Sequence, residues 1–164
     1  MIKVLQEFTF DEEVDAKEIS VSFGINCDGS SLDPDHVTTV LNVQPSSSWR
    51  KGDAYLSKTR NPKNGKIGEV VRPRYNTRWG IETKGVVKSN KVADHLSYID
   101  QLLSPKLKEI QQIIEPDDVF ARITITKESY DIDIYYDVDS SLLMRCCKLC
   151  KEITFVSLKC EKGT

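Results

Sequence analysis

The strongest constraint on the fold of this chain is a long helical pattern of apolar residues between positions 92 and 114. The pair Ser104-Pro105 interrupts this pattern, and proline fits the first turn of a helix but not its interior. We therefore expect a kink there, or a second helix that Ser104 caps and that ends before Pro116. The apolar side chains recur mostly at spacings of three and four, which places them on one helical face: Val92, Leu96, Ile99, Leu102, Leu103, Leu107, Ile110, Ile113 and Ile114.

Several segments on either side of this helix alternate between apolar and polar residues, which is typical of strands with one buried face. The clearest lies at 19–27, where Ile19, Val21, Phe23, Ile25 and Cys27 form the buried set and Gly24 belongs to the polar set. The other predicted strands are 2–10, 75–83, 119–127, 131–138 and 153–160, with 119–127 and 131–138 paired as a hairpin.

Two shorter helices and a second hairpin complete the expected elements. Asp33-Pro34 opens the first helix, because Asp33 can accept a hydrogen bond from the first turn and Pro34 suits its first position. Ser140 caps the second helix, which runs to residue 150. Asn64-Gly65 favours a tight turn between hairpin arms at 54–58 and 67–71.

This order of elements predicts an α+β fold, a mostly antiparallel sheet with helices packed on one face. The layout repeats as ββαβ–α–ββαβ, which we interpret as a ferredoxin-like pseudo-repeat. A length of 164 residues suits a single domain over residues 1–164. A basic insertion at about 50–74 lengthens the first half of the repeat.

Charge is strongly segregated along the chain. Residues 1–49 carry 2 basic and 9 acidic side chains, residues 50–91 carry 12 and 3, and residues 92–164 carry 9 and 13. Such asymmetry indicates a partner surface or internal complementarity. The basic stretch at 45–80 also has a tryptophan near each end, so we hypothesise that it is the recognition surface. Its candidate binding residues are Trp49, Arg50, Lys51, Asp53, Tyr55, Arg72, Arg74, Arg78 and Trp79.

Three interpretations of these binding residues remain open. Arginine and lysine neutralise phosphates and aromatic rings stack on bases, so a nucleic acid could bind here. The same residue types anchor protein interfaces. Alternatively, the stretch is a solvated hairpin whose tryptophans pack on the sheet.

Two further clusters have possible chemistry. Asp131, Asp133, Asp137 and Asp139 share one strand face and could hold a divalent cation for hydrolysis, although a charged edge that prevents aggregation is favoured. Cys147 and Cys150 have the spacing of redox or zinc sites. Their apolar surroundings favour buried, reduced thiols instead, and we predict no metal and no cofactor.

The sequence carries no motif of a known catalytic class. His36 and His95 are its only histidines, and neither adjoins a nucleophile motif, a phosphate loop or a zinc-protease signature. We therefore expect no catalytic residues and no enzymatic activity.

The chain resembles the bacterial and phage family of domain of unknown function 4279. The similar residues are Leu32 to Asp35, Pro45, Trp49, Lys51-Gly52-Asp53 and Trp79-Gly80, and the resemblance covers roughly residues 18–160. It implies a small accessory protein without assigned catalytic residues. Some members of this family accompany toxin genes as candidate immunity proteins.

We accordingly expect a non-catalytic binding protein that blocks a toxin or effector as an immunity protein or inhibitor. A nucleic-acid-binding module that uses the basic insertion, or a metal-dependent hydrolase that uses Asp131 to Asp139, are the alternatives. The chain has no apolar run of about 18 residues and no secretory signal pattern, so we expect a cytoplasmic location and no membrane partner.

Overall fold

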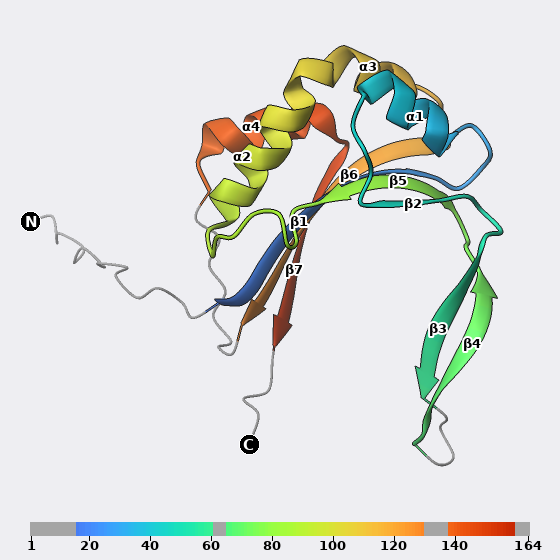
Figure 1. Cartoon of the computed structure of the whole chain (residues 1–164). Coiled ribbons are helices and arrows are strands. Elements are labelled where there is room, and N and C mark those ends of the chain that lie inside the picture. Colours follow the sequence, from blue (N-terminus) through green and yellow to red (C-terminus); the bar gives the residue numbers. More distant parts are fainter. Residues whose placement is uncertain (1–15, 61–64, 130–137, 160–164) are drawn as a thin grey trace, which may run out of the picture.

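The computed structural model describes residues 16–60, 65–129 and 138–159. It has an α+β fold, as the sequence predicted, with the helices packed on one face of a sheet (Figure 1). Within these residues the elements are β1 (Ala16–Cys27), α1 (Pro34–Leu41), β2 (Ser47–Trp49), β3 (Ala54–Arg60), β4 (Ile67–Pro73), β5 (Thr77–Glu82), α2 (Val92–Leu103), the 3-10 helix η1 (Ser104–Lys106), α3 (Leu107–Ile113), β6 (Val119–Ser129), α4 (Ser140–Leu149) and β7 (Glu152–Lys159).

The main sheet has the strand order β2-β5-β1-β6-β7, and β3 and β4 form a separate two-stranded sheet. Every neighbouring pair is antiparallel except β6 and β7, which are parallel. The sheet is therefore mixed, because α4 carries the chain back between two strands that run in the same direction. The predicted strand at 2–10 and residues 131–137 of the predicted strand at 131–138 lie outside the described residues, and Val138 is not in a strand. The ferredoxin-like pseudo-repeat is therefore not confirmed.

Alternation along β1 and β6 divides the main sheet into two faces. Val21, Phe23 and Ile25 are completely buried and lie beneath the helices, together with Ile123 and Ile125 of β6. The intervening side chains, such as those of Ser20, Ser22, Thr124 and Thr126, lie on the face that no helix covers. The core thus occupies one side of the sheet and leaves a polar face on the other.

The interruption predicted at Ser104-Pro105 is confirmed, because α2 ends there and η1 leads into α3. The role expected of Ser104 is wrong: its hydroxyl donates to the Asp100 carboxylate instead of capping the next helix. The start of α1 agrees with prediction, since Asp33 Oδ1 accepts from the backbone N–H of Asp35 at 3.1 Å. None of the described helices is long and apolar enough to cross a bilayer.

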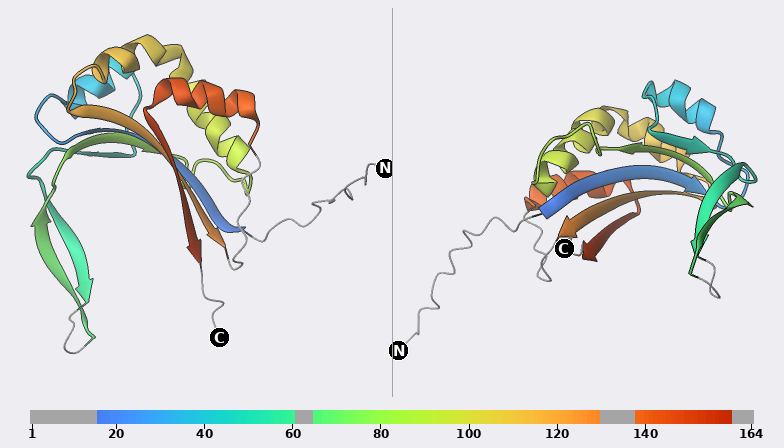
Figure 2. Two further views of the ribbon diagram at one scale, coloured as in Figure 1. Left: turned by 180° about the vertical axis from the view of Figure 1, so that it is seen from behind. Right: turned by 60° about the horizontal axis from the view of Figure 1, so that its bottom comes forward.

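The main sheet arches, with its helices over the outer side and its uncovered face on the inner side (Figures 1 and 2). The hairpin of β3 and β4 extends from one end of this arch and stands apart from the helices. The arms at 54–58 and 67–71 are confirmed and are each two residues longer than predicted. The arrangement gives the protein one covered face and one open, concave face bounded by a projecting arm.

Candidate functional site

The uncovered face of the main sheet, here called the inner face, brings together arginines and aromatic residues from the three strands β2, β5 and β6. Cross-strand register aligns Trp49, Arg78, Asn26 and Phe120 in one row. The next row contains Ser47, Gly80, Gly24, Arg122 and Glu152. Because side chains in register share one side of a sheet, both rows lie on the face without helices.

Arg74 joins the hairpin to the inner face. Its guanidinium carbon lies 4.0 Å from the ring centroid of Trp49 and 4.1 Å from that of Tyr55. The cation is thus sandwiched between one ring of β2 and one ring of β3. Each such contact contributes about 0.5–1 kcal/mol at an exposed site, so the sandwich stabilises the angle at which the hairpin leaves the sheet.

Arg78 lies at the centre of the inner face. Its Nη1 donates to Oδ1 of Asn26 at 3.1 Å, and its guanidinium carbon lies 5.6 Å from the Trp49 ring. A Cβ atom at Gly24 would lie 2.7 Å from Nη1, so the guanidinium rests directly on the glycine backbone. A larger residue at position 24 would push this cation off the sheet.

Burial changes the electrostatics of Arg78. Desolvation lowers its pKa, and the neighbouring Arg122 lowers the pKa further, whereas Glu82 raises it. Arg122 is itself paired with Glu152 through bonds of 2.8 and 2.9 Å. No ion pair to Arg78 occurs among the described residues. The inner face therefore holds a half-buried cation whose charge has no direct carboxylate partner in that part of the chain.

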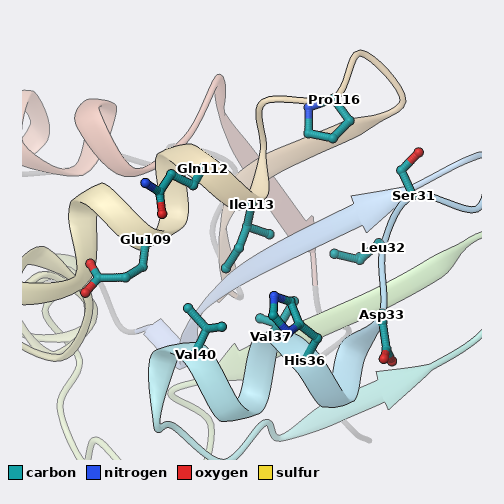
Figure 3. Close-up of a pocket in the computed structure, with 10 residues that line it drawn as sticks. All are labelled: Ser31, Leu32, Asp33, His36, Val37, Val40, Glu109, Gln112, Ile113 and Pro116. Atoms are coloured by element: carbon teal, nitrogen blue, oxygen red, sulfur yellow. The ribbon is translucent and has the colours of Figure 1, made fainter.

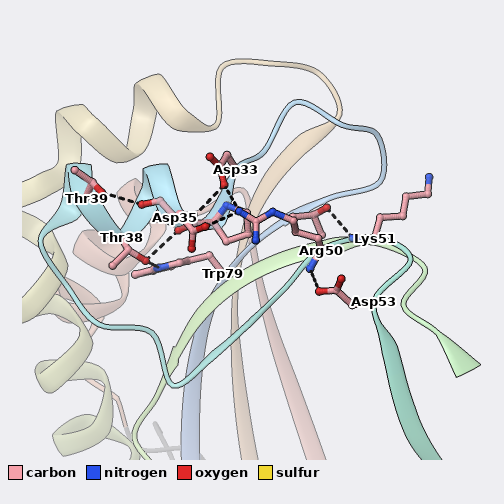
Figure 4. A network of polar contacts seen from close by, with 10 residues as sticks. Asp33, Asp35, Thr38, Thr39, Arg50, Lys51, Asp53 and Trp79 are labelled. Atoms are coloured by element: carbon pink, nitrogen blue, oxygen red, sulfur yellow. Dashed lines mark hydrogen bonds and ion pairs between the residues drawn. The ribbon is translucent and has the colours of Figure 1, made fainter. Parts of the chain in front are cut away.

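Three of the predicted binding residues build the root of the hairpin instead (Figure 4). Arg50 pairs with Asp33 at 2.8 Å and with Asp35 at 2.6 Å, and these bonds raise its pKa, Asp35 most strongly. Asp53 accepts from the backbone N–H of Arg50 at 2.7 Å, and Lys51 Nζ donates to the Asp28 carbonyl at 2.6 Å. These contacts connect the turn after β2 to α1 and to the end of β1.

Trp79 must be corrected from a binding residue to a core residue. It is completely buried under the helices, and its indole N–H donates to Thr38 Oγ1 of α1 at 3.0 Å (Figure 4). It cannot contact a partner in this structure, because its strand position places it on the face opposite Trp49.

The hairpin has two distinct faces. Arg72 stands opposite Tyr55 in the register and shares its face. The other face is exposed along its full length, and here we call it the apolar hairpin face. Leu56 and Val71 are each 65% exposed and directly opposite each other there, and Ile67 is 71% exposed. The apolar hairpin face consists of Ala54, Leu56, Lys58, Arg60, Ile67, Glu69, Val71 and Pro73.

The structure therefore gathers Trp49, Tyr55, Arg74 and Arg78 at one place, with Arg72 on the adjoining hairpin. Sequence reasoning missed the β1 and β6 contributions to this surface, which are Gly24, Asn26, Phe120 and Arg122. One signal was available, since a glycine inside a strand pattern often marks the close approach of another group.

A separate pocket of about 260 Å³ lies between α1 and α3, on the helix side of the sheet (Figure 3). Asp33, His36, Glu109 and Gln112 form its polar rim. Among the described residues, no hydrogen bond joins His36 to Asp33 or Glu109, so no acid–base pair is assembled. Its apolar wall consists of Leu32, Val37, Val40, Ile113 and Pro116.

The other chemical candidates have structural roles where they are described. His95 is buried between Thr83 Oγ1 at 2.6 Å and the Ser89 carbonyl at 2.9 Å. Asp139 caps α4, while Asp131, Asp133 and Asp137 lie outside the described residues. No cluster of three potential metal ligands occurs in the described ranges.

The two cysteines of the 147–150 motif differ in environment. Cys147 is exposed, whereas Cys150 and the adjacent Cys146 are buried. Desolvation raises the pKa of Cys146 to about 12 and that of Cys150 to about 11. Reactive thiols need a lowered pKa, so the buried pair has the properties of core residues.

Comparison with known proteins gives one result. A family model described as a domain of unknown function, DUF4279, matches residues 17–155. No curated protein and no solved structure matches the chain.

Proposed function

Because the chain belongs to the DUF4279 family, whose description names no activity, we propose its function from the geometry of its own surface. The protein is a non-catalytic binding protein that holds a protein partner against its inner face and its apolar hairpin face. The partner presents apolar side chains to the hairpin and acidic side chains to the arginines.

The observation that carries this proposal is the apolar hairpin face. Leu56, Val71 and Ile67 are each at least 65% exposed on an arm that projects from the main sheet. Leu56 and Val71 form an exposed apolar pair next to Ala54 and Pro73, and the pair Lys58 and Glu69 separates them from Ile67. Exposed apolar side chains set among charged ones are typical of protein interfaces. A solvated hairpin with no partner would gain nothing from three large aliphatic side chains on one exposed face.

The arm is also held in a fixed position, which favours binding. The Arg74 sandwich, the Asp53 turn and the Arg50 ion pairs all act at its root. A preorganised surface loses less conformational entropy when a partner binds. The predicted residues Arg50, Lys51 and Asp53 thus support binding by positioning the hairpin.

We propose further that the partner is a toxin or effector, which the chain inhibits in the cytoplasm as an immunity protein. The family resemblance to candidate immunity proteins motivates this choice. An inhibitor needs only to cover an active surface, and a concave face with a projecting arm suits occlusion. Occlusion requires no catalytic residues.

A nucleic-acid partner is less well supported by the same geometry. Base stacking needs free aromatic faces, but Arg74 occupies one face of both Trp49 and Tyr55. The apolar hairpin face would also remain in water on a nucleic acid. A hydrolase that uses Asp139 is disfavoured because this carboxylate accepts from Ser141 and Leu142 as a helix cap.

The test expresses the products of the genes that flank this gene in its native host, identifies any that stops growth, and assays it for binding and neutralisation. The protein is expected to bind one such toxin at physiological salt and to restore growth; the absence of any toxic neighbour that it binds would contradict the toxin assignment. The double variant Leu56→Ser, Val71→Ser removes the apolar contact and should weaken binding at least about tenfold.

Met144→Ser is the matched control, because Met144 is 64% exposed on α4, away from the hairpin. It should bind as tightly as the wild type. Equal affinity for the hairpin double variant, or binding of duplex or single-stranded nucleic acid in place of the toxin, would contradict the proposal. Light scattering that showed two copies of this chain joined through the hairpin would contradict it also.

A further inference from the structure

We infer that Arg78 is the point at which the inner face binds a carboxylate group of the protein partner. This inference rests on the proposed function, since it assigns the chemistry of the partner at one position. It concerns the centre of the sheet and is independent of the apolar contact made by the hairpin.

The first argument is the unused hydrogen-bonding capacity of Arg78. A guanidinium has several N–H donors in one plane, and one bond, from Nη1 to Asn26, is made within the described residues. The side chain is half-buried beside the Trp49 ring, so part of its hydration is already lost. A desolvated cation is stabilised when an anion replaces the lost water.

The second argument is the local charge. Arg122 is the neighbour of Gly24 in the register, and the Arg78 guanidinium rests on Gly24. Two guanidinium groups therefore lie close together, and Glu152 pairs with only one of them. Glu82 offsets part of this positive charge, but among the described residues it forms no ion pair with Arg78. A carboxylate in direct contact with Arg78 would supply the charge-assisted bonds that Glu82 does not make.

The third argument is access. Gly24 and Gly80 are buried, and the Arg78 side chain lies over both of them, so its guanidinium itself forms part of the inner face. Ser22 and Thr124 offer hydroxyls in the next row, where Glu82 stands opposite Ser22. The planar fork of arginine matches the two oxygens of a carboxylate in a bidentate arrangement.

The choice of a polypeptide carboxylate over a nucleic-acid phosphate follows from the aromatic neighbours. Arg74 covers one face of the Trp49 ring at 4.0 Å, and Arg78 also lies near this ring. Bases would have to displace these arginines in order to stack. An aspartate or glutamate side chain can reach Arg78 without that change.

The experiment uses the full chain labelled with ¹⁵N-arginine and the blocked peptide hexaglutamate as probe. The Arg78 Nε–H signal should shift in a saturable manner at millimolar peptide concentrations. Arg78→Gln should weaken binding at least about tenfold, since the charge-assisted bonds are lost. Lys88→Gln removes the same charge from an exposed loop and should leave binding within about twofold.

Gly24→Ala tests the geometry while keeping every charge. The three atoms nearest to its Cβ, at 2.7–2.9 Å, all belong to the end of the flexible Arg78 side chain, so the fold should tolerate the substitution. The displaced guanidinium should bind hexaglutamate about tenfold more weakly. Wild-type affinity in this variant would overturn the inference.

Two other results are informative about the partner. If Arg78→Gln binds the toxin as tightly as the wild type while Leu56→Ser, Val71→Ser does not, the inference is wrong and the proposed function stands. If oligothymidylate shifts the Arg78 signal more strongly than hexaglutamate, with a steep salt dependence, the occupant is a nucleic acid and the inference is overturned.

Discussion

Trp49 and Trp79 lie on opposite faces of one sheet, although their strands β2 and β5 are hydrogen-bonded neighbours. Trp79 pairs with Ser48 in the register and points into the core, whereas Trp49 pairs with Arg78 on the inner face. Two tryptophans near the ends of one basic stretch therefore have different roles. Trp79 stabilises the fold, and Trp49 belongs to the proposed binding surface.

The first prediction separates these roles by fluorescence. Trp49→Phe leaves Trp79 as the only tryptophan, and this variant should show blue-shifted emission and weak quenching by acrylamide, because Trp79 is completely buried. Trp79→Phe leaves Trp49 as the only tryptophan, and it should show red-shifted emission and strong quenching by acrylamide. It should also lower the free energy of unfolding in urea by about 1–3 kcal/mol, since it loses buried volume and the Thr38 hydrogen bond. Similar quenching in the two variants would disprove the assignment.

The second prediction concerns the hairpin. Arg74→Ala removes the cation from between Trp49 and Tyr55. The free energy that holds the hairpin in its position against the sheet should fall by about 1 kcal/mol. Amide hydrogen exchange in β3 and β4 should then accelerate several-fold, with little change in β1 and β6. Arg72→Ala is the control on the same arm, because Arg72 shares the face of Tyr55. Equal acceleration in both variants would show that the ring contacts do not hold the hairpin.

The third prediction concerns an ion pair between α2 and α4 in which Asp100 is buried and Arg145 is exposed. Arg145 Nε lies 2.7 Å from Asp100 Oδ2, and Asp100 is only 12% exposed. Desolvation raises the pKa of Asp100, but bonds from Ser104 and Arg145 outweigh this effect and leave the pKa below its usual value. Asp100→Asn should lower the free energy of unfolding by about 1.5–3 kcal/mol near neutral pH.

The pH dependence of this pair has a definite sign. A depressed carboxyl pKa contributes stability above the unfolded value of about 3.9, and that stability is lost as the pH falls through the folded pKa. The urea midpoint of the wild type should therefore fall from about pH 5 downward. Asp118, Asp139 and Glu152 also have lowered pKa values. Asp100→Asn should therefore make the urea midpoint depend less steeply on pH, without removing the dependence. An unchanged slope in Asp100→Asn would contradict the assignment.

The fourth prediction concerns thiol reactivity. Near neutral pH, iodoacetamide should modify Cys147 at least about tenfold faster than Cys146 or Cys150, because only the thiolate reacts. Burial raises the pKa of Cys146 to about 12 and that of Cys150 to about 11. Peptide mapping by mass spectrometry gives the three rates, and Cys147→Ser should remove the fast phase. Rapid modification of Cys150 would instead favour the redox interpretation of this motif.

The same thiols should affect stability at alkaline pH. Their pKa values are raised in the folded protein, so the stability from their burial is complete below the unfolded pKa of about 8.5. This stability should decline as the pH rises toward the pKa of Cys150, about 11, and that of Cys146, about 12. Cys146→Ala should unfold with a flatter pH dependence than the wild type above about pH 9.

The helices and strands were predicted well where their form depends on residues that are close together in the sequence. The alternation at 19–27 anticipated which residues of β1 are buried, because successive side chains in a strand must point to opposite faces. Asp33-Pro34 and Ser104-Pro105 marked helix boundaries, because the proline ring restricts the backbone wherever it occurs. The exposed hairpin arms also followed from Asn64-Gly65 and its flanking strands.

The residues of the proposed binding surface were predicted only in part, because they are distant from one another in the sequence. Gly24 and Arg78 are brought together by the pairing of β1 with β5, and Arg122 is added by β6. No local pattern indicates which strand is the neighbour of which. The basic stretch likewise could not show that Arg50 would be committed to Asp33 and Asp35, which precede it by more than a dozen residues.

The sequence by itself determined the α+β class, the interrupted long helix, the basic hairpin and the buried face of the strand at 19–27. Each depends on contacts within a few residues, where backbone geometry and periodicity act alone. The tertiary structure decided that Trp79 faces the core and Trp49 the inner face. It also decided that Arg78 rests on Gly24 without a carboxylate partner in the described chain. These outcomes depend on strand order and register, which arise from the packing of the whole sheet against its helices.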